Sequence, residues 1–183
     1  GAGVVSALKT RITSLELRGI GGPQLATLGL ESACDIHDLS VMGVEDLIRK
    51  LPNALRVRRQ LLRDFRSDPP DLFLGIDSPD FNLSLERRLR LTGIPVIHLV
   101  SPTVWAWRSY RVAKIRRAVD RILVLFPFEK DFYEERGVAA TFVGHPAAQE
   151  TAGITKESAR NQLGISSSTQ VLSILPGSRE SEI

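Results

Sequence analysis

The sequence feature that most limits the fold is a series of short, unbroken apolar runs that end on polar or aromatic residues. The clearest run, Asp71–Ile76, follows two prolines and precedes Ser78 and Pro79. A run this short and continuous is typical of a strand that is buried on both faces, as in a parallel sheet. It ends on a carboxylate, Asp77, and in open α/β sheets ligands bind beyond the carboxyl ends of the strands.

The same pattern recurs along the chain, with helical segments between the runs. Further strands are predicted at Leu15–Leu17, Pro95–Val100, Arg121–Phe126, Thr141–Val143 and Val171–Leu175. Because strands that alternate with helices form βαβ units, this order predicts an α/β fold with a parallel sheet and flanking helices. The 183 residues, 43% of them hydrophobic, suffice for one sizeable core.

Polar side chains follow five of the predicted strands. They are Asp77, Ser101, Glu129, His145 and Ser178. Since the carboxyl ends of parallel strands meet at one edge of a sheet, five such ends favour a ligand crevice over independent helix caps.

Two of these residues allow more than one interpretation. Asp77 can act as a general base or bind a substrate hydroxyl, or it can cap the helix expected at Asn82–Leu91. Ser78 and Asp80 are better placed to cap that helix, which leaves Asp77 for chemistry. His145 can donate to a phosphate or transfer a proton near neutral pH, or it can be a structural hydrogen-bonding residue.

The carboxyl-terminal segment has the composition of an anion site. Gly177 and Ser178 follow the last predicted strand and open a helix, so their backbone N–H groups can seat an anion. Arg179 adds a bidentate positive charge beside them. The segment suits a phosphate group, but it lacks the GK[ST] ending of a P-loop.

Both tryptophans, Trp105 and Trp107, lie just beyond the run Pro95–Val100. Their flat apolar rings can pack on a sugar or an acyl chain. The alternative is that the rings close the core, which we expect for one of them.

Helical periodicity runs from Val41 to Phe65, and Pro52 is expected to divide it into two helices. One face carries an apolar set with basic residues beside it. The apolar residues are Val44, Leu47, Ile48, Leu51 and Leu55. The pattern fits a core-facing helix, which the pattern alone favours, and it also fits an amphipathic helix at a membrane interface.

Charge and cysteine content limit the partners and cofactors. The net charge is only +3, but the basic residues are clustered, which suits phosphates, nucleic acid, an anionic membrane or simply solvated helix faces. Nucleic acid is disfavoured because no aromatic residues interleave with the basic ones. With Cys34 as its one cysteine, the chain can form no internal disulfide, and no cysteine-based metal site is expected.

Taken together and in this order, several motifs resemble the lipid-A-disaccharide synthase family. The matching segments are Gly19–Pro23, Val41–Gly43, Gly75–Asn82, His98–Trp107, Phe126–Lys130, Val143–Pro146 and Leu175–Arg179. The resemblance covers nearly the whole chain. It implies a GT-B glycosyltransferase, in which two Rossmann-like domains face each other across a cleft.

The resemblance also implies a reaction and a location. Family members join UDP-2,3-diacylglucosamine to 2,3-diacylglucosamine 1-phosphate with inversion and release UDP, without a metal or cofactor. They work as peripheral proteins at the cytoplasmic face of the bacterial inner membrane, or in a plant mitochondrion, and a full-length homodimer is allowed. This location changes our interpretation of the apolar face between Val44 and Leu55 to a membrane contact.

Site roles follow from the same resemblance. Asp77 is expected to be the general base, and Arg179 to stabilise the leaving diphosphate together with the amides of Gly177 and Ser178. Substrate contacts are expected from Asn82, Ser101, Trp105, Trp107, Glu129 and His145.

The resemblance predicts the domain limits as well. Residues 1–150 would be a Rossmann-like acceptor and membrane domain that lacks its first strand and glycine-rich loop. Residues 151–170 would be a linker and helix, and residues 171–183 would begin the donor-binding domain. The chain would thus be truncated at both ends and inactive alone, so disaccharide formation by the purified 183-residue chain would contradict this expectation. The alternatives are a nucleotide-sugar epimerase of the same fold and a truncated lipid-binding product without activity.

Overall fold

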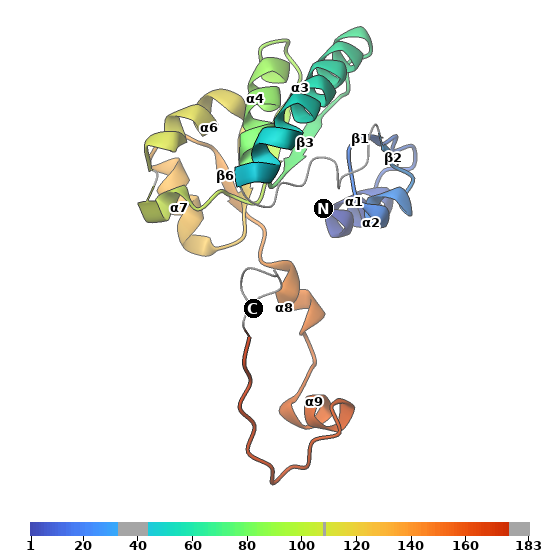
Figure 1. Cartoon of the computed structure of the whole chain (residues 1–183), viewed down its shortest axis with the longest axis vertical. Coiled ribbons are helices and arrows are strands. Elements are labelled where there is room, and N and C mark those ends of the chain that lie inside the picture. The colour runs from blue at the N-terminus through green and yellow to red at the C-terminus, as the bar shows by residue number, and fades with distance from the viewer. Residues whose placement is uncertain (33–43, 108, 176–183) are drawn as a thin grey trace. The chain divides into compact units, whose positions relative to one another are not determined.

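The structure, a computed structural model, describes residues 1–32, 44–107 and 109–175. The chain divides into two compact units, Gly1–His145 and Pro146–Ile183. The first unit contains the sheet and the buried core (Figure 1). The described residues of the second form two short helices.

A four-stranded parallel sheet organises the first unit. Its strands are β3 (Phe73–Ile76), β4 (Val96–Leu99), β5 (Arg121–Val124) and β6 (Ala140–Phe142), and they lie in this order. Gly75 is in register with His98, which is in register with Ile122. All four strands were predicted, and the parallel arrangement brings their carboxyl ends to one edge, as expected.

Helices flank this sheet and bury apolar side chains against it (Figure 1). They are α3 (Val44–Ser67), α4 (Pro79–Arg90), α6 (Val112–Ala118) and α7 (Pro127–Glu134). Leu89, Ile115 and Ile122 are fully buried. Burying an aliphatic side chain of this size contributes about 1.5–3 kcal/mol, so this core is the main source of stability.

One helix begins earlier than predicted. The helix expected at Asn82–Leu91 is α4, which starts with a proline at its first turn, as α7 does. Proline is well tolerated there because its fixed φ suits a helix and its missing N–H would have no intrahelical partner.

Helix α3 corrects another prediction, since it continues through Pro52. A proline inside a helix removes one N–H donor and crowds the preceding turn. Here the following turns are anchored by Val57, Leu61 and Phe65, which are buried in the core. Tertiary packing therefore outweighs the local break. In the described ranges, no helix combines the length and apolarity needed to cross a bilayer.

A carboxylate ties the amino ends of two strands to α4. Asp120, next to β5, accepts a hydrogen bond from the backbone N–H of Val96 at 2.8 Å and from Nε of Arg90 at 2.7 Å. Burial alone would raise the pKa of Asp120, but these two donors lower it below its usual value. The interaction keeps β4, β5 and α4 in register.

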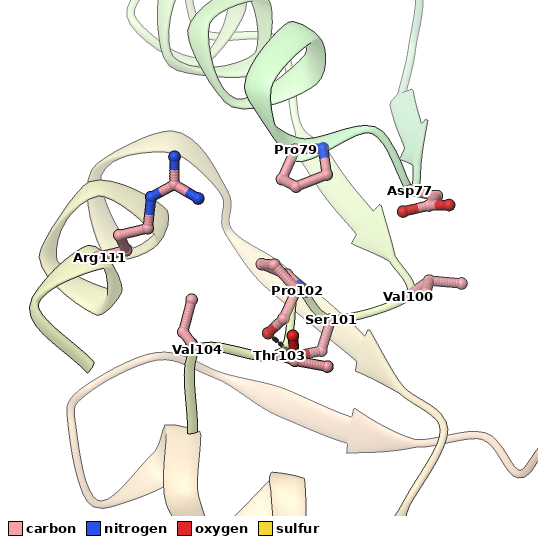
Figure 2. A pocket seen from close by; sticks show the side chains of 8 residues that line it. All are labelled: Asp77, Pro79, Val100, Ser101, Pro102, Thr103, Val104 and Arg111. Carbon is pink, nitrogen blue, oxygen red and sulfur yellow. Dashed lines mark hydrogen bonds between the residues drawn. The ribbon is translucent and has the colours of Figure 1, made fainter. Parts of the chain in front are cut away.

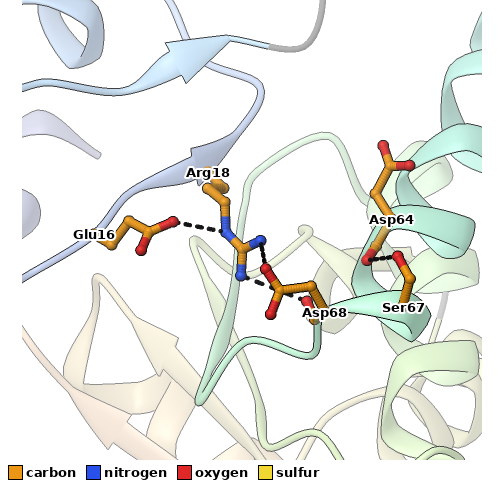
Figure 3. A network of polar contacts seen from close by, with 5 residues as sticks. All are labelled: Glu16, Arg18, Asp64, Ser67 and Asp68. Carbon is orange, nitrogen blue, oxygen red and sulfur yellow. Dashed lines mark hydrogen bonds and ion pairs between the residues drawn. The ribbon is translucent and has the colours of Figure 1, made fainter.

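The amino-terminal segment contains α1 (Ala2–Lys9), α2 (Pro23–Ala26) and a parallel pair of two-residue strands, β1 (Arg18–Gly19) and β2 (Glu31–Ser32). The strand predicted at Leu15–Leu17 is not formed, and the two-residue strand β1 lies directly after it. Arg18 pairs with Glu16 and with Asp68, which follows α3 (Figure 3).

The second unit contains α8 (Pro146–Glu150) and α9 (Lys156–Gln162). Thr155 caps α9, because its Oγ1 accepts from the N–H of Ser158 at 3.1 Å. The strand predicted at Val171–Leu175 is not formed, and these residues are exposed. A strand needs a paired neighbour, and the described part of the chain provides none for this segment.

Candidate functional site

A cavity of about 380 Å³ lies at the carboxyl ends of β3 and β4 (Figure 2). It is lined by Asp77, Pro79, Val100, Ser101, Pro102, Thr103, Val104 and Arg111. The lining thus contains one carboxylate and one guanidinium, and its other residues are apolar or small. The size is within the range of small-molecule sites, and the position is the one expected for a ligand crevice in a parallel sheet.

The backbone beside this cavity is strained. Asp77, Ser78 and Val100 have positive φ values of 50°, 45° and 74°. This left-handed region is uncommon for residues other than glycine and exceptional for a β-branched residue such as Val100. Each such residue costs of the order of 1–3 kcal/mol, and residues of this kind concentrate at functional sites.

Hydrogen bonds hold this strained edge in place. The N–H of Asp77 donates to the carbonyl of Leu99 at 2.9 Å, and the N–H of Val100 donates to that of Leu123 at 3.1 Å. The strand pairing therefore continues one residue beyond β3 and β4. Nδ2 of Asn82 donates to the carbonyl oxygen of Asp77 at 2.7 Å and to that of Ile76 at 3.3 Å.

These contacts leave the side chain of Asp77 available. It is exposed, and its carboxylate has no hydrogen-bond or ion-pair partner among the described residues. Ser78 occupies the cap position of α4 without a side-chain cap bond, and Asp80 accepts from Nη2 of Arg111 at 2.7 Å. Asn82, predicted to contact substrate, uses its amide to hold the Asp77 turn; a substrate contact from it stays a prediction.

Ser101 lines the cavity as part of a buried hydroxyl network. Its Oγ lies 2.7 Å from the hydroxyl of Tyr133 and donates to the carbonyl of Pro102 at 3.0 Å. Tyr133 is fully buried, and this burial raises its pKa to about 12. The network joins the end of β4 to α7.

Glu129 and His145 lie outside the cavity lining. Glu129 is buried, and its Oε2 accepts from the backbone N–H groups of Leu125 and Phe126 at 3.2 and 3.1 Å. It stabilises the start of α7. His145 packs near Phe126, with ring centroids 6.0 Å apart. Substrate contacts by either residue stay predictions.

An aromatic patch is formed by Trp105, which follows the cavity-lining residue Val104 in the chain, together with Phe126 and Phe128. Trp105 meets Phe128 edge-on at 4.9 Å, and Phe128 stacks on Phe126 at 5.9 Å. The three side chains are 40–49% exposed, so Trp105 does not close the core. It is the second residue of the four-residue helix α5 (Val104–Trp107), which was not predicted from the sequence.

A fully buried polar pair lies behind the strained edge. Nδ1 of His98 is 2.6 Å from Oε1 of Glu86, and both side chains are inaccessible. A Cβ added at Gly75 would lie 1.9 Å from Oε1 of Glu86, so only glycine fits there. Glu86 was not predicted as a buried polar residue, because in the sequence it looks like any polar residue of an amphipathic helix.

Several predicted residues cannot be placed. Gly177, Ser178 and Arg179 lie outside the described residues, as does the side chain of Trp107. Val44, Leu47 and Ile48 belong to α3, but their side chains are also outside the description. In the same helix Leu51 is exposed and Leu55 is partly buried. Over the described ranges, no group of three or more residues could hold a metal ion.

The parallel sheet, its flanking helices and a polar cavity at the carboxyl edge define a Rossmann-like α/β domain of the GT-B type. A family model described as lipid-A-disaccharide synthetase matches residues 1–183, the whole chain. The chain therefore belongs to the lipid-A-disaccharide synthetase family.

Curated relatives agree with this assignment. The chain is 48% identical to lipid-A-disaccharide synthase 2 of Legionella pneumophila subsp. pneumophila, with all of the chain and 48% of that protein aligned. It is 49% identical to the lipid-A-disaccharide synthase of Alkalilimnicola ehrlichii, again over the whole chain and 49% of that protein. The enzyme of Chromohalobacter salexigens gives 48% identity over the whole chain and 48% of its own length. The chain thus spans about half the length of the relatives that it matches.

Proposed function

We propose that this chain forms the acceptor-side domain of an inverting glycosyltransferase of lipid A biosynthesis. The enzyme would join UDP-2,3-diacylglucosamine to 2,3-diacylglucosamine 1-phosphate and release UDP. Family membership supports the pathway. The observation that carries the chemistry is the unpartnered carboxylate of Asp77 at the cavity beyond β3. A nucleotide-sugar epimerase would need no second sugar substrate, so incubating a UDP-sugar without acceptor separates the two activities.

In this proposal Asp77 is the general base. Its carboxylate takes the proton of the acceptor 6-hydroxyl while that oxygen forms a bond to the anomeric carbon of the donor. The bond from this carbon to the diphosphate oxygen breaks, and UDP leaves with the electron pair. Arg179, with the amides of Gly177 and Ser178, would stabilise the negative charge on the diphosphate. The strained turn supports this role because it fixes the direction of the Asp77 side chain before substrate binds.

The test uses the full-length protein that contains this chain. Asp77→Asn keeps the shape of the side chain but removes the base, so turnover should fall by about 10²–10⁴-fold. Asp71→Asn is the matched control, because Asp71 is an exposed carboxylate before β3 and outside the cavity lining. Circular dichroism would confirm that both variants are folded. Near-normal turnover of Asp77→Asn would contradict the proposal.

We also propose that the protein is peripheral to a membrane and contacts it through Val44, Leu47, Ile48, Leu51 and Leu55. The observation in favour is Leu51, which is 48% exposed, whereas Val57, Leu61, Leu62 and Phe65 of the same helix are buried. Exposed leucine beside basic residues is typical of a helix at an anionic lipid surface.

Liposome co-sedimentation tests this contact. Replacing Leu47, Ile48 and Leu51 together with serine should reduce binding to anionic vesicles. Leu91→Ser is the control, because Leu91 is an exposed leucine outside α3. Unchanged sedimentation of the triple variant would mean that this apolar face packs in the protein core and does not contact the membrane.

A further inference from the structure

Arg111 has no role in the mechanism above, although it lines the same cavity as Asp77. Among the residues that line this cavity, Arg111 is the one with a positively charged side chain. It ends the 3₁₀ helix Ser109–Arg111 and occupies the cap position of α6, so its backbone is fixed by two elements. Figure 2 shows its side chain and that of Asp77 on opposite sides of the cavity, with Pro79 and Pro102 between them.

The guanidinium retains unused hydrogen-bonding capacity. In the described part of the chain, its one hydrogen-bond partner is Oδ1 of Asp80, at 2.7 Å from Nη2. A guanidinium has five N–H donors, so this bond leaves several free. The side chain of Arg111 is 25% exposed and that of Asp80 is 76% exposed. An ion pair with so exposed a partner is weak and does not prevent Arg111 from binding a second anion.

We propose that Arg111 binds the phosphate monoester of the acceptor and thereby directs the 6-hydroxyl of the acceptor to Asp77. This inference rests on the proposed function. In the α anomer of a glucosamine 1-phosphate, C1 and C5 flank the ring oxygen, and the phosphate on C1 and the hydroxymethyl group on C5 project from opposite faces of the pyranose ring. An acceptor that is held by its phosphate at Arg111 therefore presents the hydroxyl toward the other side of the cavity, where the proposed base lies.

The chemistry of the cavity suits this ligand. A planar guanidinium matches two phosphate oxygens with two parallel N–H donors, which fixes both position and orientation. The walls at Pro79, Val100 and Val104 are apolar, so they reduce the competition from water that weakens a phosphate contact at an open surface. The apolar lining also suits the face of a sugar ring.

The experiment compares two acceptors with the full-length protein. One is 2,3-diacylglucosamine 1-phosphate, and the other is 2,3-diacylglucosamine with a free anomeric hydroxyl. The variants are Arg111→Gln, Arg111→Lys and the control Arg117→Gln, which removes the same charge from an exposed position of α6. KM and kcat are measured for each acceptor, and KM for the donor.

Arg111→Gln should lower kcat/KM for the phosphorylated acceptor by about 10- to 100-fold, mainly through KM, because a charge-assisted contact is lost. It should leave kcat/KM for the other acceptor unchanged, so the preference for the phosphate collapses. Arg111→Lys should recover part of the preference, since lysine restores the positive charge but not the two parallel N–H donors of the guanidinium. Arg117→Gln should behave like the unchanged protein.

Three results would overturn the inference. The first is an unchanged preference in Arg111→Gln, and the second is an equal loss with both acceptors, which is what a merely structural role predicts. The third is an effect on donor KM or on vesicle binding instead, which would assign the arginine to the diphosphate or to lipid headgroups. If the unchanged protein transfers to neither acceptor, the proposed function itself fails, so the two failures are distinguishable.

Discussion

The two halves of the sheet's carboxyl edge differ in how the chain leaves the strands. At β3 and β4 the chain turns through Asp77, Ser78 and Val100, all with positive φ. At β6 a glycine, Gly144, takes the positive φ of 79°, where no side chain opposes it. At β5 the chain enters α7 through Phe126 with an ordinary extended backbone, and the N–H of Phe126 donates a capping hydrogen bond to the carboxylate of Glu129.

This difference separates a strained half from a relaxed half. The strained half, at β3 and β4, contains the cavity and the proposed base. The relaxed half, at β5 and β6, contributes the aromatic surface of Phe126 and Phe128. Strain costs stability, so it persists only where neighbouring contacts hold it. We therefore expect substitutions in the strained half to alter turnover, and those in the relaxed half to alter substrate affinity or stability.

The largest effect is expected below the strained half, at Gly75. Gly75→Ala places a methyl group on the Glu86 carboxylate and close to His98. It should reduce the free energy of unfolding by about 3 kcal/mol. The Glu86 carboxylate would have to move away from the new methyl group, and it would then lose its buried hydrogen bond to His98.

Urea unfolding of the full-length protein measures this change. Gly3→Ala is the control, since a Cβ at this helical position meets no atom within 4 Å and alanine favours a helix. If Gly75→Ala is as stable as the unchanged protein, the buried pair does not support the strained half as we describe.

The next effect concerns Asn82, whose amide donors hold the Asp77 turn. Asn82→Asp has the same shape but no donors, so the turn should relax and displace the carboxylate of Asp77. Turnover should fall by about 10- to 100-fold, since small misplacements of a reacting group are costly.

Steady-state kinetics at saturating acceptor would detect this loss. The acidic replacement lies near the amino terminus of α4, where negative charge is favourable, so the fold should survive. Full turnover in Asn82→Asp would show that the strain is held by the strand pairing alone.

In the relaxed half, Phe128→Ala tests the aromatic patch. The ring is 49% exposed, so its removal should cost less than about 1 kcal/mol of stability. If the patch packs on acyl chains, KM for the diacylated acceptor should rise by up to about tenfold, with kcat unchanged. A short-chain acceptor serves as the comparison, and an equal change in KM for both acceptors would exclude an acyl contact.

The fold and the candidate site differ in how much of each could be predicted from the sequence. The four strands of the sheet were predicted because strands buried on both faces produce continuous apolar runs, as at Val96–Leu99. The strand expected at Val171–Leu175 is not formed in the described chain, because a run of this kind needs neighbouring strands to pair with. Pro52 misled the helix prediction because core packing overrides a local break.

The site was predictable only in part, for a related reason. Asp77 and Ser101 were found from their positions after apolar runs, and both line the cavity. Glu86 and Arg111 were missed because their roles come from contacts between distant segments. Glu86 meets His98 across α4 and β4, and Arg111 reaches the cavity from a short 3₁₀ helix. Neither position carries a periodic signal.

A further effect on stability is expected at Tyr133, which joins the two halves through Ser101. Tyr133→Phe removes one hydroxyl, and Ser101 keeps its bond to Pro102, so the loss at neutral pH should be about 1 kcal/mol. The effect should depend on pH, because the folded protein raises the pKa of Tyr133 to about 12, above the value of about 10 in an unfolded chain. A raised pKa means that folding favours the neutral phenol.

The stabilisation is therefore complete below a pH of about 10 and is lost as the pH rises toward about 12. Over this interval the free energy of unfolding should fall more steeply in the unchanged protein than in Tyr133→Phe. Urea unfolding of both proteins at a pH of about 8.5 and at a pH of about 10.5 compares the slopes. Equal slopes would mean that the hydroxyl is hydrated in the folded protein, and that Ser101 and Tyr133 do not couple the strained half to the relaxed one.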